Sequence, residues 1–202
     1  MGTPVWNRTG VPTLRYYWRL LRNIASVVLP RKIILIGDGA VKEAERIVSG
    51  FSFRPKRCPR PSDVPRILVF CSRARDYAEG NREVGRSPGV YRRERRINIR
   101  YIDMPWHEAI RELVVPPVKD SPHWVPFVAG AVFLFADGDS ARALRRFKLM
   151  KPLLGDGTLI VVPRIQEEAQ AETVEMLGRL GYAGITLGAV AMMRREAERG
   201  RG

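Results

Sequence analysis

The sequence predicts an α/β protein, a Rossmann-like three-layer sandwich around a mostly parallel central sheet. One observation is that apolar runs at 127–136, 158–163 and 185–193 alternate with segments of helical periodicity. The runs are apolar at consecutive positions, which is typical of strands that helices cover on both faces. Another is that an earlier apolar run, 31–36, leads into Gly37-Asp38-Gly39 and a helical segment. Strand, turn and helix in this order indicate βαβ units.

Length and composition limit the number of domains. A chain of 202 residues forms one α/β core with at most an appendage. We expect a tail and amphipathic helix over 1–30, a Rossmann-like domain over 31–196 and a frayed tail over 197–202. Two cysteines and two histidines are too few for a disulfide framework or a zinc site, so no metal is expected.

No apolar run approaches the roughly 18 to 20 residues that a membrane-spanning helix needs. The first residues also lack the apolar block and small-residue cleavage site of a signal peptide. The sequence therefore predicts a soluble, cytoplasmic protein without a transmembrane segment.

The individual elements follow from short runs of Val, Ile, Leu and Phe between turn residues and helical periods. In order, we expect a helix at 13–29, strands at 31–36, 66–71 and 97–102, a helix at 106–114, a proline-rich loop at 115–126, a strand at 127–136, a helix at 141–154, a glycine turn at 155–157, a strand at 158–163, a helix at 165–180 and a last apolar run at 185–193. The first helix either packs on the sheet edge or lies on a nucleic-acid or membrane surface.

The charge of the chain is strongly positive, +14, from 35 basic and 21 acidic residues. Such a charge favours polyanions as partners, RNA ahead of DNA, with protein partners in a ribonucleoprotein as a further alternative. The densest basic tract supplies the candidate phosphate contacts, which are Arg92, Arg93, Arg95 and Arg96. The alternative is a solvated loop before a strand, within a surface of mixed sign.

The turn Gly37-Asp38-Gly39 is the first candidate binding loop. Glycines let the backbone turn sharply and approach a ligand, and the helix that follows offers unpaired N–H groups. Its context, with a strand before and a helix after, is that of cofactor loops at the carboxyl edge of a parallel sheet. The alternative is a plain turn between strand and helix.

Several segments resemble one family in pattern and order. They are 133–135, the helix with Leu144 and Phe147, the segment 150–162 and the segment 176–182. Together they resemble the second half of class I S-adenosylmethionine-dependent methyltransferases, where a strand and helix precede a lysine-proline-glycine turn, a strand, and a helix ending in glycine and an aromatic residue. The resemblance implies a methyltransferase-type Rossmann-like fold and S-adenosylmethionine as cofactor.

The resemblance also implies roles for particular residues. Gly37, Asp38 and Gly39 would hold the methionine end of the cofactor, and Asp103 the adenine amino group. Asp137 would face the substrate, although Asp137 and Asp139 also fit a turn and helix cap, with Asp139 or Ser140 as the cap. His123 is a further candidate as a general base.

The chain departs from the family pattern at two anchors. Leu35 stands where an acidic residue usually precedes the first glycine, and Cys71 stands at the strand end that usually holds an acid for the ribose. Val41 replaces the third glycine. These departures indicate a degenerate member of the family as the alternative to an active one.

Three functions therefore remain open from the sequence. The first is a methyltransferase acting on or bound to RNA or a ribonucleoprotein. The second is a non-catalytic RNA-binding or ribosome-associated protein of the same fold. The third is another nucleotide-binding Rossmann enzyme. In addition, Asp103-Met104-Pro105-Trp106 resembles the motif of amino-group methyltransferases, although an aspartate that caps the following helix is the commoner arrangement.

Overall fold

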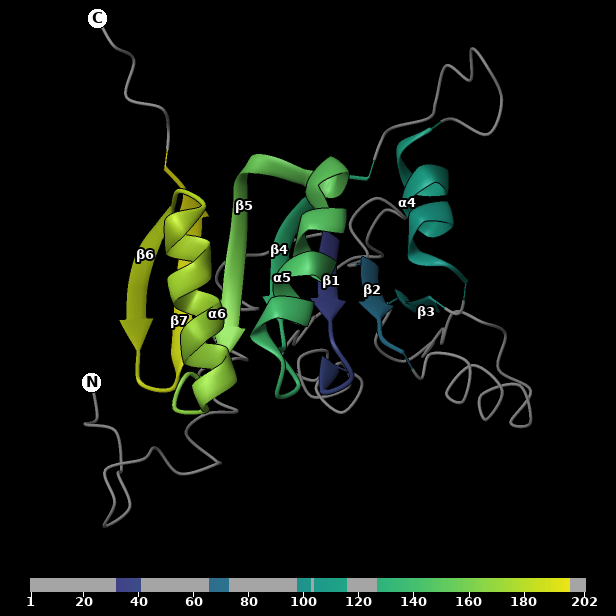
Figure 1. Cartoon of the computed structure of the whole chain (residues 1–202). Helices are drawn as coiled ribbons and strands as arrows, with labels where there is room; N and C mark the ends of the chain where they lie inside the picture. The colour runs from purple at the N-terminus through teal and green to yellow at the C-terminus, as the bar shows by residue number, and fades with distance from the viewer. Residues whose placement is uncertain (1–31, 41–65, 73–97, 103, 116–126, 197–202) are drawn as a thin grey trace, which may run out of the picture.

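The computed structural model describes residues 32–40, 66–72, 98–102, 104–115 and 127–196 (Figure 1). Seven strands form one sheet in the order β3-β2-β1-β4-β5-β7-β6. The strands are β1 (Lys32–Ile36), β2 (Arg66–Phe70), β3 (Asn98–Ile102), β4 (Ala129–Leu134), β5 (Leu154–Pro163), β6 (Tyr182–Leu187) and β7 (Val190–Arg195).

The first five strands are parallel to one another, and β7 pairs antiparallel with both β5 and β6. The predicted α/β class and mostly parallel sheet are therefore confirmed. Because β1 to β5 run in one direction, their carboxyl ends lie at one edge of the sheet. The strand order reverses between β1 and β4, which makes their ends a topological switch point, the place where open α/β sheets bind ligands.

Consecutive apolar residues in the central strands serve both faces of the sheet. In β1, Ile33 and Leu35 belong to one core cluster, Ile34 and Ile36 to the other, and all four are 0% exposed. The second cluster lies beneath three helices, α4 (Trp106–Val114), α5 (Ser140–Leu149) and α6 (Glu168–Arg179), which cover one face of the sheet (Figure 1).

The segment from α5 to β5 differs from the sequence prediction in two places. The helix expected over 141–154 ends at Leu149, and a 3₁₀ turn, η2 (Lys151–Leu153), leads into β5. The glycines expected to form a turn at 155–157 lie inside β5, where the Thr158 hydroxyl accepts from the Gly155 N–H and donates to the Ala129 carbonyl. Side-chain bonding thus keeps this irregular stretch within the strand.

The last apolar run, 185–193, is not one strand but most of a hairpin. Gly188 has a φ of 59°, which an L-residue adopts only at a cost, and it turns the chain from β6 back into β7. The hairpin places β7 next to β5 and β6 at the end of the sheet order.

Candidate functional site

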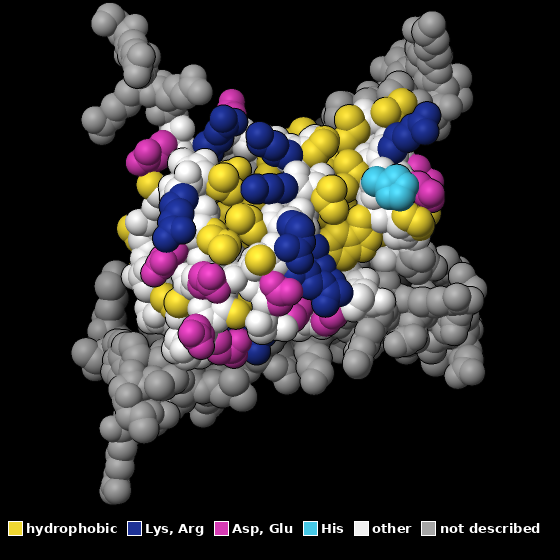
Figure 2. Space-filling model, viewed as in Figure 1, with side chains coloured by type: hydrophobic (Ala, Val, Ile, Leu, Met, Phe, Trp, Pro, Cys, Tyr) yellow, Lys and Arg dark blue, Asp and Glu magenta, His cyan; other side chains and the backbone are white. Residues whose placement is uncertain are grey.

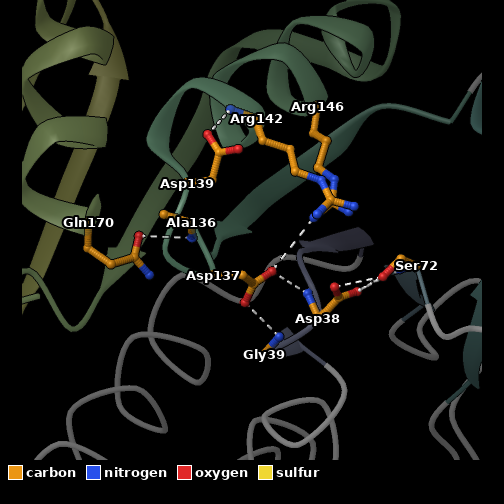
Figure 3. Close-up of polar contacts among 9 residues, drawn as sticks. All are labelled: Asp38, Gly39, Ser72, Ala136, Asp137, Asp139, Arg142, Arg146 and Gln170. Carbon is orange, nitrogen blue, oxygen red and sulfur yellow. Dashed lines mark hydrogen bonds and ion pairs between the residues drawn. The ribbon is translucent and has the colours of Figure 1, made fainter. Parts of the chain in front are cut away.

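The loops after β1 and β4 meet at the switch point (Figure 3). The Asp137 carboxylate, from the loop after β4, accepts from two backbone N–H groups of the loop after β1. Its Oδ2 lies 2.5 Å from the Asp38 nitrogen and its Oδ1 lies 2.9 Å from the Gly39 nitrogen. The Asp137 side chain thus bridges the two loops, although Asp137 lies 99 residues from Asp38 and 98 residues from Gly39 in the sequence.

Backbone conformation makes this contact possible. Gly37 has a φ of 116°, and a Cβ at this position would lie 2.6 Å from the Phe135 carbonyl oxygen and 2.7 Å from Asp137 Oδ2. Asp137 itself has a φ of 53°, a left-handed conformation that aspartate tolerates better than most residues. Glycine at 37 therefore lets the two loops approach closely enough for the carboxylate to reach.

Asp38 turns its own carboxylate toward the end of β2. Its oxygens accept from the Ser72 backbone N–H and hydroxyl, all at 2.7 Å. Burial alone would raise the pKa of the Asp38 carboxyl. The two Ser72 donors and the positive charges of Arg146 and Arg142 outweigh burial, so the pKa lies below the ordinary aspartate value.

Replacing Ser72 by alanine is expected to raise the pKa of Asp38. The variant loses the hydroxyl hydrogen bond that stabilises the ionised carboxylate against the effect of burial. Stability that depends on ionised Asp38 is present above the ordinary aspartate pKa and is lost as the pH falls through the lowered one. In the variant the folded-state pKa lies closer to the ordinary value, so this contribution to stability is smaller and its loss is complete at a higher pH. Carbon-13 NMR titration of the Asp38 carboxyl measures the shift directly. Ser140→Ala, which removes a hydroxyl bonded to Glu172, is the matched control and should leave the Asp38 titration in place.

Two arginines flank the bridging carboxylate. Arg146 of α5 has a side chain only 10% exposed; its Nη1 lies 3.6 Å from Asp137 Oδ2 and its guanidinium 5.0 Å from the Trp106 ring centroid. Burial and the nearby Arg142 lower the pKa of Arg146, while the Asp38 and Asp137 carboxylates oppose that shift. The group stays charged, since arginine is not deprotonated in proteins.

Arg164 follows β5, where its guanidinium lies 5.8 Å from the Phe135 ring centroid and forms an ion pair of 3.1 Å with Glu167. A Cβ at Gly39 would lie 3.1 Å from its Nη2. The edge of the sheet around the glycine loop therefore carries two carboxylates, Asp38 and Asp137, beside two guanidinium groups.

Hydrogen bonds to α5 and α6 fix the loop after β4. Asp139 caps α5, since its Oδ1 accepts from the Arg142 N–H at 2.8 Å; the predicted cap at 139 is confirmed. Gln170 of α6, 1% exposed, accepts from the Ala136 N–H at 3.2 Å. Its Nε2 has no hydrogen-bond partner within the described ranges. Asp137 itself is not a cap, because its carboxylate serves the glycine loop.

The predicted site residues divide into two sets. Gly37, Asp38, Gly39 and Asp137 come together at the switch point. The remaining candidates, which are Asp103, His123, Arg92, Arg93, Arg95 and Arg96, lie outside the described residues. The N-cap residue of α4 is Pro105, which makes no side-chain hydrogen bond to the helix; the cap predicted for Asp103 lies outside the described residues and stays a prediction.

Three residues of the site were not predicted from the sequence: Ser72, Arg146 and Arg164. Ser72 stands beside the expected acid position and could have been considered there. Arg146 lies between Ala143 and Phe147 on the apolar face of α5, and a charged residue on such a face is a signal for a buried partner. Arg164 carries no comparable pattern.

The two positions where the family pattern predicts acidic residues, Leu35 and Cys71, are both buried. Leu35 is 0% exposed within the core, and Cys71 at the end of β2 is 3% exposed. Among the residues that the structure describes, no group of acidic, histidine or cysteine side chains could hold a metal ion. Within the same residues, no helix is both long and apolar enough to cross a membrane.

No protein-family model and no curated protein matches the sequence. Solved structures, however, match its fold. A putative caffeoyl-CoA O-methyltransferase from Staphylococcus aureus has a TM-score of 0.53 at 12% identity, over 96% of this chain and 86% of that one. A Podospora anserina methyltransferase bound to S-adenosylhomocysteine has 0.52 at 13%, over 92% and 80%. An O-methyltransferase from Bacillus cereus, also bound to S-adenosylhomocysteine, has 0.51 at 12%, over 94% and 84%.

Identities this low show a shared fold. The chain has the Rossmann-like fold of class I S-adenosylmethionine-dependent methyltransferases, as the sequence resemblance predicted.

Proposed function

We propose that this protein binds S-adenosylmethionine and is an S-adenosylmethionine-dependent methyltransferase. The observation that carries the proposal is the position of the Gly37–Gly39 loop, at the β1/β4 switch point of a sheet with the fold of such enzymes. Two of the matching structures hold S-adenosylhomocysteine, the product that methyl transfer leaves behind.

In this proposal Gly37, Asp38 and Gly39 face the methionine end of the cofactor, and Asp103 remains the predicted partner of the adenine. Asp137, predicted to face the substrate, has its carboxylate on this same loop. The cofactor supplies the reactive methyl group, and the protein contributes mainly by binding and aligning the acceptor.

Isothermal titration calorimetry with S-adenosylmethionine and S-adenosylhomocysteine tests the proposal. We expect saturable binding with a Kd below about 1 mM, within the usual range of enzymes for their substrates. Reduced nicotinamide cofactors serve as the comparison, because they represent the other Rossmann enzymes. Binding of those cofactors in place of S-adenosylmethionine would show that the site belongs to a different class.

A second candidate is a non-catalytic protein of the same fold that binds RNA. The absence of carboxylates at Leu35 and Cys71 favours it, because the cofactor loses two usual contacts there. Lys and Arg side chains on one face of the molecule also support an RNA partner. Figure 2 shows Lys and Arg side chains spread over the side on which α4, α5 and α6 lie.

The α5 part of that face is defined by Arg142, Arg145, Lys148 and Lys151. All four are exposed, and none has a described ion-pair partner. Three of them recur every third residue along α5, so they lie along one side of the helix. A row of cations without an ion-pair partner among the described residues suits the phosphates of a nucleic-acid backbone.

Neutralising two of these cations, in the double variant Arg145→Gln and Lys148→Gln, is expected to weaken binding of single-stranded RNA of any sequence. The slope of log affinity against log salt should become shallower by about 0.7 for each phosphate that the variant no longer neutralises. Fluorescence anisotropy with a labelled oligonucleotide measures both the affinity and the slope. Arg179→Gln on α6, which removes a cation already near Glu175 at 4.0 Å, is the control. An affinity that does not change with salt would exclude this RNA surface.

A further inference from the structure

The described part of the glycine loop already has an anionic partner, the carboxylate of Asp137. Successive backbone N–H groups in a turn form a site that attracts anions. Here the Asp38 and Gly39 N–H groups both donate to Asp137. A ligand anion that approached the same two groups would meet an occupied position.

The placement of Asp137 is specific. Its neighbour Asp139 provides the cap of α5, so helix capping does not account for Asp137. Its φ of 53° costs about 1 to 2 kcal/mol for a residue with a side chain, and such a conformation persists where surrounding contacts fix it. The contacts that fix Asp137 are those with the Asp38 and Gly39 N–H groups and with the Arg146 guanidinium.

Removal of the carboxylate is compatible with the backbone. Glycine adopts a φ of 53° without strain, so Asp137→Gly deletes the anion and also relieves the left-handed strain. Asp137→Asn keeps the size of the side chain and its tolerance of this conformation but removes the charge. Comparing the two variants therefore separates the effect of the Asp137 charge from the effect of the size of its side chain.

We propose that Asp137 is a latch residue: it ties the β4 loop to the glycine loop and competes with the carboxylate of an amino-acid-bearing ligand for the Asp38 and Gly39 N–H groups. The competition rests on the proposed function, since S-adenosylmethionine and S-adenosylhomocysteine both carry an amino-acid carboxylate. Adenosine, which lacks that end, does not compete with the latch.

The test of competition is calorimetry of wild type, Asp137→Gly, Asp137→Asn and the control Asp139→Asn with S-adenosylhomocysteine and with adenosine. Asparagine is as good a helix cap as aspartate, so the control should behave as wild type. We expect both Asp137 variants to bind S-adenosylhomocysteine at least tenfold more tightly, with no change for adenosine. Unchanged binding of S-adenosylhomocysteine would overturn the proposal. So would weaker binding, because the carboxylate would then be holding the ammonium group of the ligand.

A second measurement tests the tie without any ligand. Amide hydrogen exchange at Asp38 and Gly39, followed by NMR, should be at least tenfold slower in wild type than in Asp137→Gly, while the β4–β5 amides remain equally protected in both and show that the variant is folded. Equal exchange at Asp38 and Gly39 would overturn the latch. If the exchange differs as expected but no variant binds S-adenosylhomocysteine or adenosine, the tie stands and the methyltransferase proposal fails.

Discussion

Replacing Gly37 by alanine is expected to destabilise the protein by about 3 to 5 kcal/mol, from left-handed strain and from steric overlap in a packed site. The overlap is with parts that cannot move easily: a Cβ would lie 2.6 Å from the Phe135 carbonyl oxygen and 2.8 Å from the Phe135 Cβ. Relief requires the loops after β1 and β4 to separate, so ligand binding at the switch point should be abolished as well. Urea denaturation measures the free energy of unfolding.

Gly138→Ala is the matched control for this prediction. Gly138 also has a positive φ, 83°, but a Cβ there would meet nothing within 4 Å. The control therefore carries the backbone strain without the overlap and should cost about 1 to 2 kcal/mol. Equal losses in the two variants would mean that the close approach of the loops contributes nothing.

Replacing Phe135 by alanine is expected to cost about 3 to 5 kcal/mol, the usual range for truncating a buried aromatic residue. Phe135 is 0% exposed and stands between Gly37 and the Arg164 guanidinium. The cavity would lie directly behind the glycine loop and leave Arg164 without its aromatic surface. Differential scanning calorimetry should show the loss as a lower Tm.

The milder variant Phe135→Leu separates packing from the aromatic contact. It keeps the site apolar and most of its volume, so the loss should be nearer 1 to 2 kcal/mol. If Phe135→Leu and Phe135→Ala are equally destabilised, cavity formation is not the cause.

The sequence predicted the sheet well because burial on both faces leaves a plain signal. Ile33 to Ile36 are apolar without interruption, and runs of this kind identified four of the five parallel strands. The other strand, β3, was predicted although Asn98 and Arg100 interrupt its apolar residues. The β6–β7 hairpin was not predicted, because the apolar run 185–193 continues through the turn. Gly188 is the only residue in that turn that indicates a change of direction. The glycines before Thr158 were misassigned, since the hydroxyl that keeps them in β5 bonds to Ala129 in another strand.

The site was predictable only in its separate pieces. Gly37, Asp38, Gly39 and Asp137 were each identified, but the bond between the two loops joins residues 99 positions apart, and local patterns carry no such information. Asp38 was expected to face a ligand, yet its carboxylate bonds to Ser72. Arg146 was not singled out, because the sequence contains many arginines. Its position on the apolar face of α5 distinguishes it from the others.

The long sequence separation across the switch point also bears on how the chain folds. Pairing β6 with β7 closes a turn of a few residues, whereas pairing β1 with β4 brings together Ile33 and Ala131. Closing the longer loop costs more chain entropy, and contacts of this kind slow folding. The hairpin can form from local contacts, while the bridge between Asp137 and the glycine loop requires the parallel half of the sheet to be in place first. Partly folded chains would therefore contain the hairpin before they contain the bridge between the two loops.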